Sequence, residues 1–272
     1  MGRALAHYLD QPARRYEAFA VAPTHTLRKY LRPGDILLVE GDKRISVAIK
    51  YLTQSTWSHA AIYIGDALGD SGDGTDPNSL VEADLQSGVI AVPLSKYENF
   101  NSRICRPIGL TDDDQQKVVQ FIVENLGLAY DLKNVIDLMR YLLPQPPVPQ
   151  RWRRRMLSLG SGSPTRAICS TLIAQAFQSV RYPILPVVLG EKVHSYVRGE
   201  YTAQDIMYIR HHSLYTPRDF DLSPYFQVIK PTIEDGFDYK KMVWHDRVST
   251  DFNPTPRDAS DWRLPAGVRI RK

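Results

Sequence analysis

The amino-acid sequence predicts an α+β fold, in which a small antiparallel sheet packs on helices. Short apolar runs that stop at glycine or at turn-forming residues indicate strands, and they lie at residues 35–41, 57–65, 80–85, 88–94 and 102–110. Apolar side chains at helical spacing indicate helices, and they lie at residues 45–55, 111–126, 132–143 and 168–177. The strands precede most of the helices, and we expect them to pair antiparallel.

The strands at 57–65 and 80–85 are predicted to form a hairpin. The first is rich in aromatic and branched side chains, which favour strands. Residues 66–79 are nearly all turn formers, and they connect it to the second strand. The helix at 111–126 has a good N-cap in Thr111, and the three aspartates that follow favour its positive end. The helix at 168–177 is apolar on most faces and should be buried.

Length and composition fit one globular domain with appendages. The chain has 272 residues, of which 43% are hydrophobic. We divide it into a leader or cap at 1–30, a catalytic domain at 31–230 that includes a basic linker at 145–164, and a C-terminal extension at 231–272. The net charge of +4 is too mild to indicate a nucleic-acid-binding protein. The sequence leaves the oligomeric state open.

The leader lacks the continuous apolar stretch of a secretory signal or a membrane span, because charged residues such as Asp10 and Arg14 interrupt it. We therefore expect a cytoplasmic protein. The leader is weakly amphipathic and basic, so it fits either a solvated cap helix or a peripheral membrane contact. The basic cluster at 151–155 similarly fits either a solvated loop or a site for phosphate or anionic lipid.

Metal and cofactor sites are not expected. The chain has two cysteines, Cys105 and Cys169, which excludes a disulfide scaffold and a self-contained four-cysteine zinc site. Cys105 is most simply a packing residue. His211 and His212 are adjacent, and neighbouring residues on a strand point to opposite faces, so they make a poor pair of metal ligands.

Cys169 is a candidate nucleophile, because it lies at the start of the predicted helix 168–177. The unpaired N–H groups of a helix start lower the pKa of a thiol and can bind an oxyanion, and Arg166 adds positive charge nearby. The alternative is that Cys169 is a small buried hydrophobic residue. Ser170 has almost the same position, but a hydroxyl needs a much stronger base than a thiol.

His59 and Glu82 are candidates for a base and its orienting acid. Glu82 lies across the predicted hairpin from the strand of His59, where it can hold the second nitrogen of the imidazole. The alternatives are a hydrogen-bonded core histidine and an edge-strand charge that discourages aggregation. Asp84 shares a strand face with Glu82 and competes for the role. Trp57 and Tyr63 fit either the wall of a substrate pocket or the core, and Ser170 is a further candidate for substrate contact.

Four segments together resemble the YiiX/YebB-like branch of the NlpC/P60 superfamily, and they are residues 32–41, 45–65, 81–94 and 168–177. The resemblance implies a circularly permuted papain-like fold, similar to that of the lecithin retinol acyltransferase group. In the permuted members the histidine strand precedes the cysteine helix, as His59 precedes Cys169 here. The resemblance implies that Cys169 is the nucleophile, His59 the general base and acid, and Glu82 the orienting residue.

A cysteine hydrolase that acts through a thioester is the function this resemblance implies. Its substrates would be short peptides or amino-acid amides, such as cell-wall fragments. The alternative is a phospholipase or acyltransferase that acts on lipid acyl chains. A third hypothesis is a binding module without activity, and it predicts that His59 and Cys169 do not approach each other.

Overall fold

The computed structural model describes residues 11–12, 18, 22–69, 76–84, 87–128, 168–197 and 200–241. The chain divides into two compact units, residues 1–235 and residues 236–272. In the second unit the described part contains the short 3-10 helix η3 (Tyr239–Lys241). The predicted helix at 132–143, the basic linker at 145–164 and Arg166 lie outside the described residues, as do most of the leader and the chain after residue 241.

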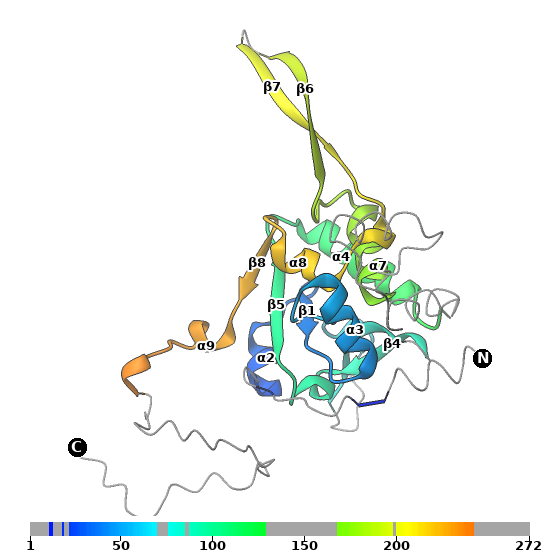
Figure 1. Ribbon diagram of the computed structural model, residues 1–272, viewed down its shortest axis with the longest axis vertical. Coiled ribbons are helices and arrows are strands. Elements are labelled where there is room, and N and C mark those ends of the chain that lie inside the picture. Colours follow the sequence, from blue (N-terminus) through cyan, green and yellow to red (C-terminus); the bar gives the residue numbers. More distant parts are fainter. Residues whose placement is uncertain are drawn as a thin grey trace, which may run out of the picture. The chain divides into compact units, whose positions relative to one another are not determined.

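A six-stranded sheet with the strand order β4-β3-β2-β1-β5-β8 forms the centre of the first unit (Figure 1). Every neighbouring pair is antiparallel. The strands are β1 (Ile36–Val39), β2 (His59–Tyr63), β3 (Asn78–Asp84), β4 (Gly88–Pro93), β5 (Ser102–Pro107) and β8 (Phe226–Ile229). The predicted α+β fold with a small antiparallel sheet is therefore confirmed. The edge strand β8, which lies far along the chain, was not predicted.

Helices surround this sheet. They are α2 (Thr24–Tyr30), α3 (Arg44–Thr53), α4 (Asp112–Glu124), α7 (Ile168–Ser179), α8 (Pro217–Leu222) and α9 (Pro231–Glu234), with the 3-10 helices η1 (Leu94–Tyr97) and η2 (His212–Leu214). The predicted cap of α4 is present, since the Thr111 hydroxyl accepts a hydrogen bond from the Asp114 amide at 3.2 Å. The α8 helix begins with a capping box between Thr216 and Asp219.

The two faces of the sheet bury separate apolar clusters, because successive strand residues point to opposite sides. On one face, Ala60 and Ile62 of β2 join a cluster with Ile173 of α7. On the other face, Ala61 of β2 joins a cluster with Leu27 of α2. Helix α7 is thus held against β2 by apolar packing, and this packing fixes the place of its first turn.

A long hairpin follows α7. It consists of β6 (Val187–Val197) and β7 (Glu200–Tyr208), which pair antiparallel from Val187 opposite Tyr208 to Val197 opposite Glu200. The register is irregular between Val188 and Lys192. Among the described residues, we find no helix with the length and apolar character needed to cross a membrane.

Candidate active site

The candidate active site lies where β2 and β3 stop pairing. The two strands pair only at Ile62 opposite Val81 and Tyr63 opposite Leu80. The Ile64 amide donates to the Ser79 carbonyl of the β3 side at 2.8 Å, whereas the Tyr63 amide donates toward β1. Because strand amides alternate in direction, the even-numbered amides of β2 point toward β3. The Ala60 amide therefore points into the opening between the strands.

Cys169 fills this opening. It is the second residue of α7, and its side chain is buried. The Ala60 amide donates a hydrogen bond to the Cys169 sulfur, which thus takes the place of a β3 carbonyl. The Ser170 hydroxyl lies 3.9 Å from the same sulfur. The hydrogen bond from the Ala60 amide connects the start of α7 with the start of β2.

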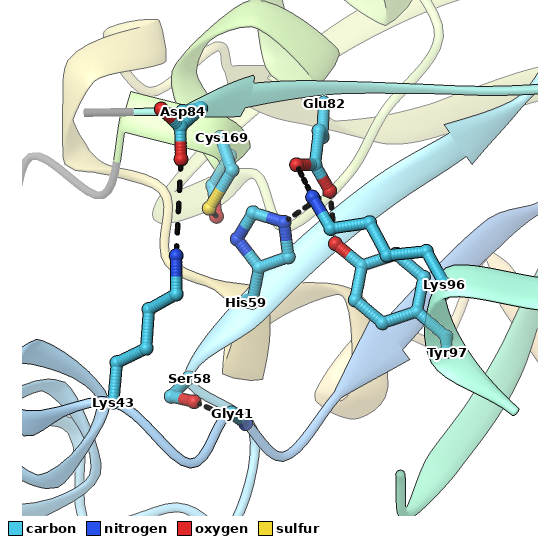
Figure 2. A network of polar contacts seen from close by, with 10 residues as sticks. Gly41, Lys43, Ser58, His59, Glu82, Asp84, Lys96, Tyr97 and Cys169 are labelled. Atoms are coloured by element: carbon cyan, nitrogen blue, oxygen red, sulfur yellow. Dashed lines mark hydrogen bonds and ion pairs between the residues drawn. The ribbon is translucent and has the colours of Figure 1, made fainter. Parts of the chain in front are cut away.

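His59 is the first residue of β2, and its ring lies between Cys169 and Glu82 (Figure 2). Its Nε2 atom is 3.0 Å from Oε2 of Glu82. Its other nitrogen, Nδ1, faces the sulfur of Cys169, with which the imidazole forms a hydrogen bond. The predicted nucleophile, base and acid thus lie together in one line of contacts, although they come from α7, β2 and β3.

Glu82 is held by three donors. Its side chain is only 2% exposed, so every oxygen needs a partner. Oε2 accepts from the Tyr97 hydroxyl as well as from His59, and Oε1 accepts from the Lys96 ammonium group (Figure 2). The ring centroids of His59 and Tyr97 are 6.0 Å apart. A buried carboxylate with this set of partners keeps one orientation and stays ionised.

Burial opposes a charge on each of the three groups, but their mutual contacts outweigh it. The Cys169 thiolate and the Glu82 carboxylate raise the pKa of His59 to about 10. The imidazolium of His59 and the Ala60 amide lower the pKa of the Cys169 thiol. His59 and Lys96 lower the pKa of Glu82. These directions favour a thiolate and an imidazolium side by side at neutral pH.

The competing acid Asp84 is held by other partners. Its carboxylate accepts from the Ser87 amide at 2.9 Å and lies 4.0 Å from the Lys43 ammonium group. In Figure 2 this pair lies on the opposite side of Cys169 from Glu82. Glu82 is therefore the acid that meets the second nitrogen of His59.

The other candidate residues lie around this centre in different ways. Trp57 is buried, and its indole N–H donates to Asp221 of α8 at 3.1 Å. Tyr63 lies at the other end of β2 from His59 and packs against the apolar cluster on the α2 face. Ser170 is fully buried beside the sulfur. Ser170 thus makes a polar contact with Cys169.

Lys96, Tyr97 and the Ala60 amide were not predicted as parts of the site. The two side chains belong to a short 3-10 helix whose sequence carries no periodic pattern, and only the fold brings them to Glu82. A backbone amide leaves no mark in the sequence. Ala60 could have been suspected only because it follows His59 on the same strand. An interrupted strand pairing cannot be seen from the sequence of one strand.

The sheet, the following helix and the order of the site residues are those expected of a permuted papain-like fold of the α+β class. Residues 30–141 match the family described as permuted papain-like amidase enzymes, YaeF/YiiX, C92 family. This segment includes His59 and Glu82, and Cys169 lies after it. The match confirms the YiiX-like permuted papain-like relationship that the sequence predicted.

One similar curated protein is named "Probable lipoprotein peptidase YaeF" and comes from Escherichia coli (strain K12). The two chains are 22% identical over 170 residues, which cover 57% of this chain. The alignment spans 58% of the length of the relative.

Proposed function

We propose that this protein is a cysteine-dependent amidase in which Cys169, His59 and Glu82 act together. The observation that carries the proposal is that one imidazole ring contacts both the Cys169 sulfur and the Glu82 carboxylate, which is 3.0 Å away. This arrangement activates a thiol and stabilises the charge that remains on the base. The hypothesis of an inactive binding module required the cysteine and the histidine to be apart, and their contact argues against it.

The reaction proceeds in two halves. The Cys169 thiolate attacks the amide carbonyl carbon, and the carbonyl oxygen takes up the electron pair of its π bond. The imidazolium of His59 then gives its proton to the leaving amine as the C–N bond breaks, which leaves a thioester and a neutral imidazole. In the second half, the imidazole takes a proton from water, the hydroxide attacks the thioester, and the Cys169 thiolate leaves as the acid forms.

The first turn of α7 is our proposal for the oxyanion site. Cys169 is the second helical residue, so its backbone N–H belongs to the first turn, where amides lack a partner inside the helix. A free amide beside the nucleophile can donate to the oxygen of a tetrahedral intermediate. The positive end of the helix dipole supports the same negative charge.

Peptide or lipoprotein amides are the substrate class we favour. The matched family consists of amidases, and the relative from E. coli is named as a probable lipoprotein peptidase. A lipid acyl substrate would call for an exposed apolar segment, and the stretch that comes nearest to one, residues 141–149, lies outside the described residues. Peptides and lipids therefore need a direct comparison.

Iodoacetamide labelling tests the nucleophile without knowledge of the substrate. Cys105 is an internal reference, because it is fully buried and burial raises the pKa of its thiol. At about pH 6, where an ordinary thiol is protonated, we expect mass spectrometry to find Cys169 alkylated much faster than a model thiol. The His59→Ala variant should remove this advantage. Equal rates for Cys169 and a model thiol, unchanged by His59→Ala, would show that the assignment is wrong.

Hydrolysis of amidated peptides and of phospholipid vesicles should be measured in parallel. We expect turnover of peptides that is lost in Cys169→Ala and retained in the matched variant Cys105→Ala. The Ser170→Ala variant should keep most of the activity, because its hydroxyl only supports the thiolate. Loss of activity in Ser170→Ala with unchanged labelling of Cys169 would point to the serine as nucleophile, and turnover of vesicles alone would favour the lipid class.

A further inference from the structure

The 3-10 helix η1 is built to hold two donors against Glu82. Leu94 and Tyr97 are buried in the apolar cluster on the α2 face of the sheet, which anchors both ends of η1. The Ser95 amide donates to the Asp76 carboxylate at 2.7 Å. Lys96 and Tyr97 are consecutive, yet each reaches a different oxygen of Glu82. A surface ion pair would need none of this anchoring.

We propose that Lys96 and Tyr97 act on His59 through Glu82, because both draw negative charge from its carboxylate and so limit how strongly it holds the imidazolium proton. The inference rests on the proposed function, and it makes Lys96 and Tyr97 positioning and tuning residues that do not touch the substrate. The geometry points to different tasks for the two. Tyr97 shares Oε2 with His59 and competes directly for its lone pairs, whereas Lys96 compensates the charge from Oε1.

The Glu82 carboxylate must not stabilise the imidazolium too strongly, because His59 has to release its proton in every turnover. A buried carboxylate with no partner except the imidazole would stabilise the imidazolium strongly, since little water screens it. An imidazolium held in this way would give its proton slowly to a leaving amine. The Lys96 side chain is 38% exposed, so water screens its charge and weakens, without abolishing, its attraction to Glu82.

Apart from the residue that is substituted, the charged groups that face this centre are the same in every protein that we compare. Among the described residues, the titratable groups around His59 include Cys169 of α7, Glu82 and Asp84 of β3, and Lys96 and Tyr97 of η1. Lys43, at the N-cap of α3, lies 4.0 Å from Asp84 and compensates its charge. Among these charged groups Cys169 has the largest effect on the pKa of His59, so it is removed in every protein that we compare.

The test is an NMR titration of the His59 ring in a Cys169→Ala background, with the resonance assigned from a His59→Gln variant. Lys96→Met and Tyr97→Phe are each compared with Lys117→Met, since Lys117 forms an exposed ion pair with Asp113 within α4. We expect Lys96→Met to raise the pKa of His59 by about 0.5 or more, and Tyr97→Phe to raise it by a similar or smaller amount. Lys117→Met should leave it unchanged.

An unchanged pKa of His59 in both variants would overturn the proposal and reduce the pair to a structural clamp. A lower pKa would also overturn it, because it would mean that Lys96 serves to keep Glu82 ionised. The proposed function fails in a different way. If Cys169 is no thiolate, the Cys169→Ala substitution by itself will leave the pKa of His59 unchanged, whatever Lys96 does.

Discussion

Trp57 and Asp221 are joined by a hydrogen bond from the indole N–H to the carboxylate at 3.1 Å, although they are 164 positions apart. Asp221 also accepts from Arg103 at 2.6 Å, and the Arg103 guanidinium group lies 4.9 Å from the centre of the Trp57 ring. The three side chains tie α8 and β5 to the segment that leads into β2. The position of His59, two residues after Trp57, therefore depends on a helix from a distant part of the chain.

We expect Trp57→Phe and Asp221→Ala each to lower the free energy of unfolding, by about 1–3 kcal/mol, because each removes the hydrogen bond between the two side chains, and Asp221→Ala also leaves the buried indole N–H without its acceptor. Urea unfolding of both single variants and the double variant measures this. The losses should not be additive, since the residues share one bond. Additive losses would mean that the hydrogen bond contributes little.

Glu82→Gln should lower the pKa of His59 by about one unit or more, since it removes the carboxylate that stabilises the imidazolium. The weaker imidazolium in turn raises the pKa of Cys169, so alkylation at about pH 6 should slow. Both quantities can be followed, by NMR and by labelling. Glu124→Gln, on the exposed side of α4, is the control. An unchanged pKa of His59 would contradict the role of Glu82.

The pair of Cys169 and His59 makes opposite contributions to the dependence of stability on pH. The pKa of His59 is raised from 6.5 to about 10, so its contribution is fully present below 6.5 and is lost as the pH rises through about 10. The pKa of Cys169 is lowered from 9.0, so its contribution is fully present above 9.0 and is lost as the pH falls. Between 6.5 and 9.0 the two slopes oppose each other.

We therefore expect a flat window when the double variant Cys169→Ala/His59→Gln is compared with the wild type. We take the free energy of unfolding of the wild type minus that of the double variant. This difference should change little between pH 6.5 and 9.0 and should decline above 9.0. Urea unfolding at a series of pH values checks this. A steady slope across the window would indicate that only one of the two groups is ionised in the folded protein.

Gly41→Ala should destabilise the loop that precedes α3. A Cβ atom at this position would lie 2.3 Å from the Ser46 hydroxyl and 3.2 Å from the Ser58 hydroxyl. The Ser58 hydroxyl accepts the Gly41 amide at 2.9 Å (Figure 2), which holds Ser58 beside this position, and the Ser46 side chain is buried and has little room to move. We expect a loss of about 1–3 kcal/mol in thermal or urea unfolding. Adding Ser46→Ala should restore part of it; no recovery would place the strain elsewhere.

Local patterns in the sequence were sufficient to predict β1 to β5 and the helices α3, α4 and α7, but not α2, α8 or α9. Thr111 and the following aspartates predict the start of α4, because capping depends on neighbours in the chain. The same holds for Cys169, whose position in the first turn of α7 follows from the apolar helix behind it. The hairpin turn formers after residue 65 predict that the strands of His59 and Glu82 are neighbours, and they are.

Contacts between distant segments could not be predicted in this way. Strand β8 is short, and it is recognisable as a strand only from its pairing with β5, as in Ile229 opposite Ile104. The strand β6 has Gly190, Glu191 and Lys192 within its apolar run, which hides the strand pattern, and the structure has its irregular register between Val188 and Lys192. The partners of Glu82 depend on where η1 packs, and no spacing in the sequence reports that.

The Ala60 amide, in the opening between β2 and β3, provides an NMR reporter of the proposed nucleophile. The Ala60 amide can donate one hydrogen bond, and it donates it to the Cys169 sulfur. Its ¹H and ¹⁵N frequencies should therefore follow the ionisation of the sulfur, its alkylation, and its conversion into an acyl thioester. The Ala60 amide peak would then show which form of Cys169 is present at each moment of a reaction. No dye or chromogenic substrate would be needed.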